Sequence, residues 1–166
     1  EDAPDFKFPK EALADSTFEY FVSKKSSWRY KGDNSVVGKK IGIITGHTYD
    51  PVTMDLVKKH KKSFIEVSGD KGLSTLVKML DAGRIDAFIE SPNVFNYFLL
   101  SHGLGKDQYQ SAGMAPQTPQ KITVCFSPKS PNSDMLIQFY QTGLKGLKSS
   151  GRLKEIYKKY GFRLPK

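Results

Sequence analysis

The sequence predicts an α/β protein in which helices cover both faces of a mainly parallel sheet. Residues 41–45 form a short apolar run of the kind expected for a strand that is buried on both faces, and residues 64–67 and 85–90 are predicted to be the next two strands. Two segments with a helical spacing of apolar residues separate these strands, and such units make right-handed crossovers between parallel strands. A chain of 166 residues can bury this core in one domain or in two small lobes.

The part of the chain before this alternation is expected to be less regular. Residues 1–15 contain two prolines and little periodicity, which predicts a leading segment without a packed element of its own. Residues 17–23 are rich in aromatic and β-branched side chains and are predicted to form a strand. The polar stretch 24–40 carries glycine, aspartate and asparagine, so we expect it to run over the surface.

Capping residues predict where the helices between the strands begin. Pro51 suits the first turn of a helix, with Asp50 or Thr48 as its cap. The next helix is expected to open at Ser68 or Asp70 and to close at a glycine. The apolar residues that give this second helix its buried face are Leu73, Leu76, Val77 and Leu80.

The remaining chain is predicted to add a helix over residues 92–101, strands over 109–115 and 121–127, and two C-terminal helices over 132–149 and 153–160. One face of the first C-terminal helix is apolar. That face consists of Leu136, Phe139, Tyr140, Gly143, Leu144 and Leu147.

The composition excludes some functions and leaves others open. No apolar run approaches the ~20 residues that cross a bilayer. The net charge of +9 would attract nucleic acid, anionic lipid or acidic ligands alike, and its densest cluster, residues 58–62, fits the solvated carboxyl end of a helix. No nucleic-acid-binding motif accompanies the cluster, so we predict no nucleic-acid partner. The single cysteine, Cys125, lies among apolar residues and is predicted to be buried.

The loop after residues 41–45 is the most informative candidate site, because ligands of open parallel sheets bind at the carboxyl ends of the strands. Gly46 would let the backbone approach a ligand closely, and threonine hydroxyls add hydrogen-bond donors. The following helix would favour a carboxylate or phosphate group, although an ordinary turn between a strand and a helix also uses glycine and threonine. The candidate ligand-binding residues of this loop are Thr45, Gly46, His47, Thr48 and Tyr49.

Glu90, at the end of the third of these predicted strands, is the other candidate ligand-binding residue. It could pair with a cation of the ligand, or it could cap its own helix and pair with a surface lysine. Residues 68–70 form a third loop, which is predicted to be a plain helix cap. The three histidines are widely spaced, so we predict no metal, no cofactor and no catalytic residue, with His47 as a polar lining residue rather than a general base.

The order of several motifs resembles one known family. Residues 37–46, residues 76–90, and residues 124–131 followed by 134–160 resemble, in this order, the amino-acid-type family (family 3) of extracellular solute-binding proteins of ABC transporters. The middle segment contains the run DAGRIDAFIE, and the C-terminal part contains SGRLKEI and KYG. Each piece alone is common, but the combination is specific and covers nearly the whole chain.

The resemblance implies a type II periplasmic-binding-protein-like fold, with two α/β lobes that close on a ligand about a hinge. Residues 1–16 would be the outgoing end of lobe 1 and the hinge, and residues 17–126 a three-layer α/β/α lobe 2. Residues 127–166 would be the return hinge and the C-terminal helices of lobe 1. The first strands and helices of lobe 1 have no counterpart in the sequence. We therefore expect an incomplete lobe 1 that forms a homodimer or exchanges segments between chains.

The same resemblance implies a function. The chain would be the solute-binding component of an ABC-type uptake system, a periplasmic protein without enzymatic activity whose signal peptide is absent from this sequence. It would bind a small polar solute, such as an amino acid, and present it to a membrane permease. Gly46, His47 and Thr48 match the family's ligand loop, and Glu90 matches an acidic position that binds the ligand's ammonium group, where aspartate is common. Two alternatives stay open: an extracellular sensory domain, and an enzyme resembling cyclohexadienyl dehydratases that would use His47 with Glu90.

Overall fold

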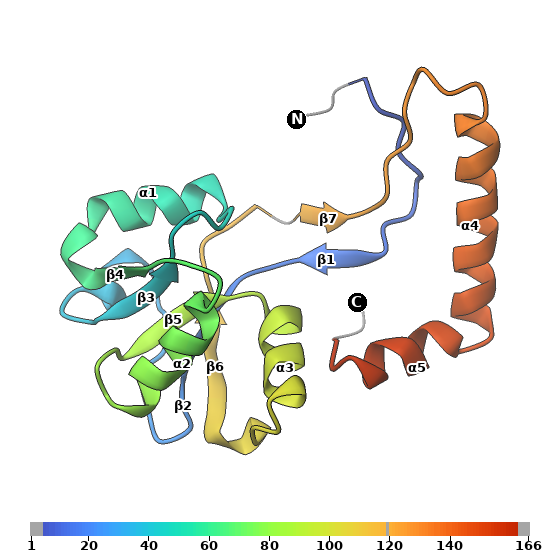
Figure 1. The fold of residues 1–166 in the computed structure, drawn as a ribbon. Helices are drawn as coiled ribbons and strands as arrows, with labels where there is room; N and C mark the ends of the chain where they lie inside the picture. Colours follow the sequence, from blue (N-terminus) through green and yellow to red (C-terminus); the bar gives the residue numbers. More distant parts are fainter. Residues whose placement is uncertain (1–4, 119, 163–166) are drawn as a thin grey trace. The chain divides into compact units, whose positions relative to one another are not determined.

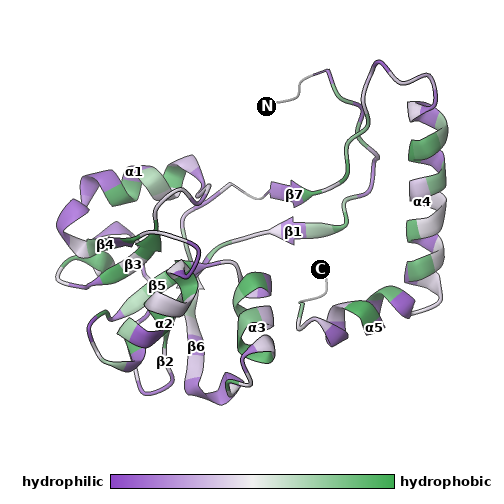
Figure 2. Cartoon of the chain, viewed as in Figure 1, coloured by the Kyte–Doolittle hydropathy of each residue, from purple (hydrophilic) through white to green (hydrophobic). Residues whose placement is uncertain are grey.

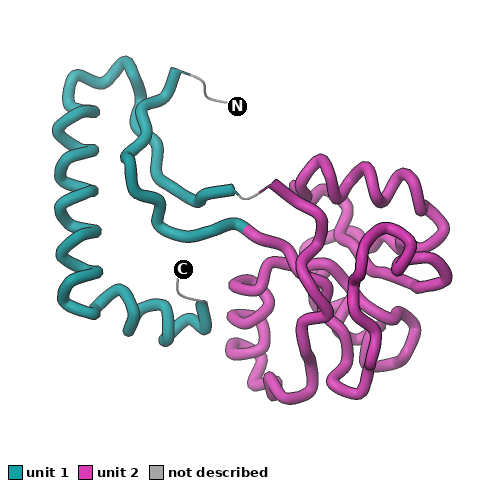
Figure 3. Tube along the Cα trace, turned by 180° about the vertical axis from the view of Figure 1, so that it is seen from behind, with its two compact units in different colours: residues 1–16, 119–166 teal, residues 17–118 magenta. Residues whose placement is uncertain are grey.

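The computed structural model describes residues 5–118 and 120–162 (Figure 1). The chain divides into two compact units (Figure 3). Unit 2 is the continuous segment Thr17–Thr118, and unit 1 combines the two ends of the described chain, up to Ser16 and from Gln120 onward. The chain therefore passes between the units twice, which is the connectivity of a two-lobed protein.

Unit 2 is built on a five-stranded sheet with the order β4-β3-β5-β2-β6. Four of the strands point in the same direction, because β3 pairs in parallel with β4 and β5, whereas β2 pairs antiparallel with both β5 and β6. The predicted mainly parallel sheet is thus a mixed one. The strand that runs the other way is β2, which no helical crossover joins to its neighbours in the sheet. The strands are β2 (Glu19–Ser23), β3 (Ile41–Ile44), β4 (Phe64–Val67), β5 (Ala87–Glu90) and β6 (Tyr109–Met114).

Helices cover both faces of this sheet and give unit 2 the three layers that the sequence predicts. The helix α1 (Pro51–Lys59) packs Leu56 and Val57 into one cluster with residues of the sheet. The helices α2 (Gly72–Asp81) and α3 (Pro92–Ser101) pack into a second cluster on the other face. Both β3 and β5 are buried along their whole length, as expected for strands covered on two sides.

Successive residues of β3 face opposite helices. Ile41 and Ile43 belong to the cluster that contains α1, and Ile44 belongs to the cluster that contains α2. Gly42 shares the α2 face, where a β-carbon would collide with the Cδ2 atom of the buried Leu76. The glycine is therefore what allows α2 to pack closely on the middle of the sheet.

Asp50 is the N-cap of α1, one of the two caps that the sequence offers. Its Oδ1 accepts a hydrogen bond of 2.9 Å from the Val52 N–H. Its Oδ2 accepts a second bond of 2.9 Å from the N–H of Thr118, the last residue of unit 2. The buried carboxylate thus joins the start of α1 to the segment that leaves unit 2.

The second helix starts differently from the prediction. Neither Ser68 nor Asp70 caps α2. The N-cap residue is Lys71, and its side chain makes no capping hydrogen bond to the first turn of the helix. The turn before the helix is closed instead by the backbone bond from Gly72 N–H to Gly69 O, of 2.9 Å. The helix does stop near the predicted glycine, Gly83, which has a φ of 65°.

Unit 1 contains a two-stranded ladder and two helices. The strands β1 (Ala14–Ser16) and β7 (Gln120–Ile122) pair antiparallel, and a Lys121–Asp15 ion pair spans them. Residues 120–126 belong to the same compact unit as this ladder, whereas the sequence predicts lobe 2 up to residue 126. The predicted strand 121–127 is correspondingly short, and Cys125 is exposed rather than buried because it lies in irregular chain beyond β7.

The C-terminal helices α4 (Ser133–Ser149) and α5 (Arg152–Lys159) pack on each other in unit 1. Leu144 is only 3% exposed and forms a small cluster with Leu153 and Tyr157 of α5. Tyr140 is partly buried against this cluster, but other residues of the predicted apolar face of α4 are exposed, and Phe139 is 63% exposed. Figure 2 shows hydrophobic segments along this helix. The other exposed apolar residues of α4 are Met135, Leu136 and Leu147.

The substitution Asp50→Ala is expected to destabilise unit 2 by about 2 kcal/mol, because it removes the acceptor of two backbone N–H groups. Urea unfolding followed by the fluorescence of Trp28, which packs against the unit 2 core, measures the change. Asp55→Ala is the matched control on the same helix, since Asp55 is exposed and pairs only with Lys58 at the surface. Equal effects of the two substitutions would contradict the capping role.

Candidate functional site

A hollow of about 340 Å³ lies at the carboxyl ends of β3, β4 and β5. This is the position at which open α/β sheets bind ligands. The hollow brings together four of the six predicted ligand-binding residues, whereas Thr48 and Tyr49 are not part of its lining. The lining residues are Ile44, Thr45, Gly46, His47, Gly69, Asp70, Gly72, Leu73, Glu90 and Val94.

The loop after β3 is a tight turn whose backbone is largely satisfied within the protein. The Thr45 N–H donates to Val67 O at 2.8 Å, and the His47 N–H donates to Ile44 O at 3.3 Å. Gly46 has a φ of 84°, in the left-handed region that favours glycine. The turn presents the exposed His47 side chain at the edge of the hollow. Thr48 is exposed as well, but it lies outside the lining.

Tyr49 supports the loop from beneath instead of lining the site. Its side chain is buried, and its hydroxyl accepts a hydrogen bond of 2.9 Å from the Ile44 N–H. Its ring lies 6.1 Å from the ring of His47, measured between centroids. Burial and the nearby Glu90 carboxylate raise the pKa of Tyr49, so the hydroxyl stays protonated. Tyr49 is therefore a structural residue of the candidate site.

The expected carboxylate or phosphate cradle at the start of α1 is not what the structure shows. The Asp50 carboxylate already occupies that helix end and accepts the Val52 N–H. The hollow itself is lined by two further carboxylates, those of Asp70 and Glu90. Acidic groups in the lining favour a positively charged group of a ligand over an anion.

Glu90 is the most unusual group in the hollow. Glu90 is only 2% exposed, and its Oε1 accepts a hydrogen bond of 2.7 Å from the Ser91 N–H. Its other oxygen, Oε2, is buried and has no hydrogen-bond partner within the part of the chain that the structure describes. Burial raises the pKa of the Glu90 carboxyl to about 7, although the Ser91 bond acts in the opposite direction. A cationic donor that entered the hollow would satisfy the free oxygen.

Asp70 is a lining residue that the sequence does not predict. Residues 68–70 are expected to form a plain helix cap, but the N-cap of α2 is Lys71 and Asp70 is exposed at the hollow. One sequence feature could have indicated it. Asp70 follows the carboxyl end of β4, so by the rule for parallel sheets it belongs at the same edge as Glu90.

No protein-family model matches the chain, and no curated protein matches it by sequence. Its structure is similar to solved structures. Substrate-binding domain 2 of Lactococcus lactis GlnP, in an open conformation, is 20% identical with a TM-score of 0.63, and 96% of this chain and 65% of that chain align. The amino-acid ABC transporter substrate-binding protein AbpA from Streptococcus pneumoniae, bound to L-arginine, is 19% identical with a TM-score of 0.60. The alignment covers 93% of this chain and 60% of that chain. An ancestral cationic amino acid solute-binding protein is 15% identical with a TM-score of 0.71. The alignment covers 96% of this chain and 64% of that chain.

These likenesses establish the fold of the chain. It has the type II periplasmic-binding-protein-like fold, as the sequence resemblance implies. The chain spans between 60% and 65% of the length of the three solved structures. Within residues 5–118 and 120–162, no helix combines the length and the apolar character that a membrane span requires.

The buried carboxyl makes the stability of unit 2 depend on pH. Glu90 binds its proton more tightly in the folded protein, with a pKa of about 7, than in the unfolded chain, where the ordinary value is 4.5. The free energy of unfolding should therefore fall as the pH rises through this window, by up to about 3 kcal/mol. Glu90→Gln should remove this loss, so the variant should be more stable than the parent chain at about pH 8 and similar at about pH 5.

Urea unfolding of both chains across this pH range, followed by Trp28 fluorescence, measures the effect. Asp107→Asn is the control, because it removes one exposed carboxylate from the same unit. If the parent chain is as stable as Glu90→Gln at about pH 8, ionisation of the buried Glu90 carboxyl does not lower the free energy of unfolding, and the prediction is wrong.

Proposed function

We propose that this chain is the ligand-binding part of a solute-binding protein of an ABC-type uptake system, and that it holds the ammonium group of a small polar solute such as an amino acid. The observation that carries the proposal is the buried Oε2 of Glu90 in the lining of the hollow, for which residues 5–118 and 120–162 supply no hydrogen-bond donor. An ammonium or guanidinium group supplies the charged donor that this oxygen lacks.

The chemistry of the hollow supports a small cationic or zwitterionic solute. A volume of about 340 Å³ is at the lower end of the range for small-molecule sites. A bound cation would favour the ionised form of Glu90 and lower its pKa, so the solute would also relieve the cost of burying the carboxylate. Asp70 adds a second negative charge at the rim. The solute's cation would therefore lie nearest to Glu90.

Similar proteins support the same class of ligand. AbpA is described with bound L-arginine, and another similar structure is an ancestral cationic amino acid solute-binding protein. We propose the corresponding partners for this chain: an amino acid or a similar solute, and a membrane permease that receives it. This role places the protein at the outer face of a membrane, in the periplasm in the case of a two-membrane cell. A sensory domain would use the same site with a signalling partner.

We propose that the site binds without catalysis. An enzyme resembling cyclohexadienyl dehydratases is the second candidate, because a buried carboxyl with a pKa near 7 is suited to general acid catalysis. His47 lines the same hollow but is exposed, and no hydrogen bond links it to Glu90 within the described residues. Turnover of a cyclohexadienyl acid such as prephenate that disappears in Glu90→Gln would favour the enzyme.

Binding can be tested with the common L-amino acids as probes. A solute that binds the folded chain should raise its melting temperature, and titration calorimetry then gives the affinity. Glu90→Gln should weaken binding of the best probe by at least about thirtyfold, because a buried charge pair is lost. Asp107→Asn should leave the affinity unchanged, and the analogue of the probe that lacks the ammonium group should bind the parent chain poorly.

Two outcomes would contradict the proposal. An analogue without the ammonium group that binds as tightly as the amino acid would show that Glu90 does not recognise a cation. Equal affinities of the parent chain and Glu90→Gln would place the binding site elsewhere.

We further propose that the uncovered face of α4 is an association surface between two copies of the chain. Large apolar side chains that stay exposed on a helix commonly mark a protein interface. Two of them, Phe139 and Leu136, lie three residues apart on that face. A second copy presents the same apolar face, so the contact can be symmetric.

Light scattering after size-exclusion chromatography should therefore detect a dimer that Phe139→Ser converts to monomers. Leu100→Ser is the control, because Leu100 is also an exposed apolar residue on a helix but belongs to unit 2. A parent chain that is monomeric at all concentrations tested, or a control with the same effect, would refute the association surface.

A further inference from the structure

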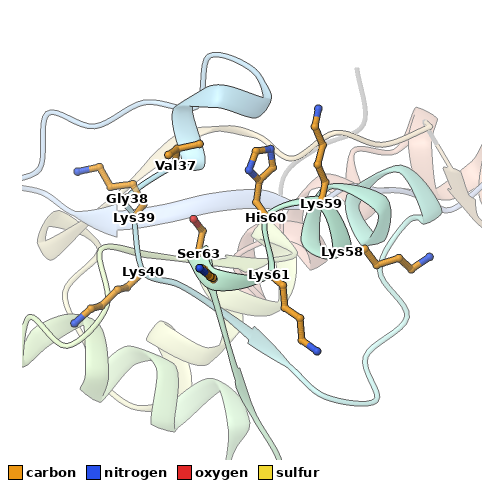
Figure 4. Close-up of a pocket in the computed structure, with 10 residues that line it drawn as sticks. Val37, Gly38, Lys39, Lys40, Lys58, Lys59, His60, Lys61 and Ser63 are labelled. Atoms are coloured by element: carbon orange, nitrogen blue, oxygen red, sulfur yellow. The ribbon is translucent and has the colours of Figure 1, made fainter.

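A second and larger hollow lies at the opposite end of the unit 2 sheet, where β3 and β4 begin. Its volume is about 660 Å³, and two segments form it: the chain just before β3, and the end of α1 with the turn that leads into β4. We call the face around it the basic surface, and Figure 4 shows its residues as sticks. The lining consists of Val37, Gly38, Lys39, Lys40, Lys58, Lys59, His60, Lys61, Lys62 and Ser63.

The positive charge of the basic surface exceeds what the end of a helix explains. The last turn of α1 accounts for Lys58 and Lys59, which also pair with Asp55 and Asp33 at 3.0 and 2.8 Å. The other four lysines have no ion pair among the residues that the structure describes, although the Asp86 carboxylate accepts the backbone N–H of one of them. Those four are Lys39, Lys40, Lys61 and Lys62.

The lysines do not converge on a single point. In Figure 4 the side chains of Lys40, Lys58, Lys59 and Lys61 extend in different directions from the hollow. One small anion could therefore contact only some of them at a time. A layer of negative charges spread over an extended surface could meet all of them, because each lysine acts as a flexible point charge.

The composition of the basic surface distinguishes among extended anionic partners. Protein interfaces are enriched in arginine and aromatic residues and depleted in lysine, yet the lining has six lysines and neither arginine nor a Phe, Tyr or Trp ring. Binding of single-stranded nucleic acid relies on aromatic rings on which bases stack, and the lining has none. The phosphate headgroups of an anionic lipid surface need only positive charge, which lysine clusters supply.

We propose that the basic surface docks unit 2 on an anionic lipid surface. This inference goes beyond solute binding and uses a different end of the sheet. Because the solute hollow lies at the carboxyl ends of the strands, it stays accessible while the amino ends of β3 and β4 face the headgroups. Attraction to the lipid should be electrostatic and should weaken as salt screens it.

Co-sedimentation with lipid vesicles tests the proposal on the full chain. The chain should bind vesicles that contain about one third phosphatidylglycerol, should not bind pure phosphatidylcholine, and should be released by about 0.5 M salt. The triple variant Lys40→Gln, Lys61→Gln, Lys62→Gln should bind the anionic vesicles at least about tenfold more weakly, since each lysine near the surface contributes about fivefold. All three side chains are exposed, so we expect the variant to fold, which circular dichroism checks.

The matched control removes three other exposed lysines of the same unit: Lys24→Gln, Lys25→Gln, Lys106→Gln. It has the same net charge as the test variant, so binding within about threefold of the parent chain would assign the effect to the basic surface. An equal loss in both variants would refute the proposal, because net charge alone would then explain binding. Tighter binding to duplex DNA than to the anionic vesicles, at equal phosphate concentration, would overturn the lipid proposal in favour of a nucleic acid. Failure to bind anionic vesicles at low salt would refute the proposal outright.

Discussion

Burial of the unit 2 sheet on both faces is the constraint on which the rest of this structure depends. Every residue of β3 and β5 is buried, and these residues are apolar side chains and one glycine except for Glu90. Glu90 is the last residue of β5, and Pro92 begins α3 immediately afterwards, so the carboxylate remains at the boundary of the core. The Ser91 N–H bonds to one of its two oxygens, and the second oxygen has no hydrogen-bond partner among the residues that the structure describes.

The two ends of the same sheet have opposite chemistry. At the carboxyl ends, the carboxylates of Glu90 and Asp70 line a small hollow. At the amino ends, lysines from two segments surround a larger one. The excess positive charge of the chain is therefore not spread evenly over unit 2. A cationic solute is attracted to the acidic end and repelled from the basic end. An anionic surface is attracted to the basic end and repelled from the acidic end. The two hollows can serve different partners without competition.

Unit 1 depends on pairing between distant parts of the chain. The ladder of β1 and β7 joins residues more than one hundred positions apart, and the Tyr157 hydroxyl of α5 donates to the backbone carbonyl of Leu13 next to β1. These contacts hold α5 to the start of the chain. They do not cover the outer face of α4, where Phe139 and its neighbours stay exposed. Unit 1 therefore has a small core of its own and exposed apolar side chains on α4, which are the basis of the proposed association surface.

The sequence by itself determined the local structure of this protein. Periodicity and caps predicted β4, α3 and the start of α1 at Pro51, because these features depend on neighbouring residues. The motif order also indicated the fold. Tertiary structure decided the rest, since it depends on contacts between residues far apart in the chain. The direction of β2, the pairing of β7 with β1 and the exposure of Cys125 are of this kind. So is the candidate site: Glu90 could be chosen from its position, but only packing shows that Tyr49 is buried beneath the loop and that Asp70 lines the hollow. Only packing shows, too, that one oxygen of Glu90 has no hydrogen-bond partner within the described chain.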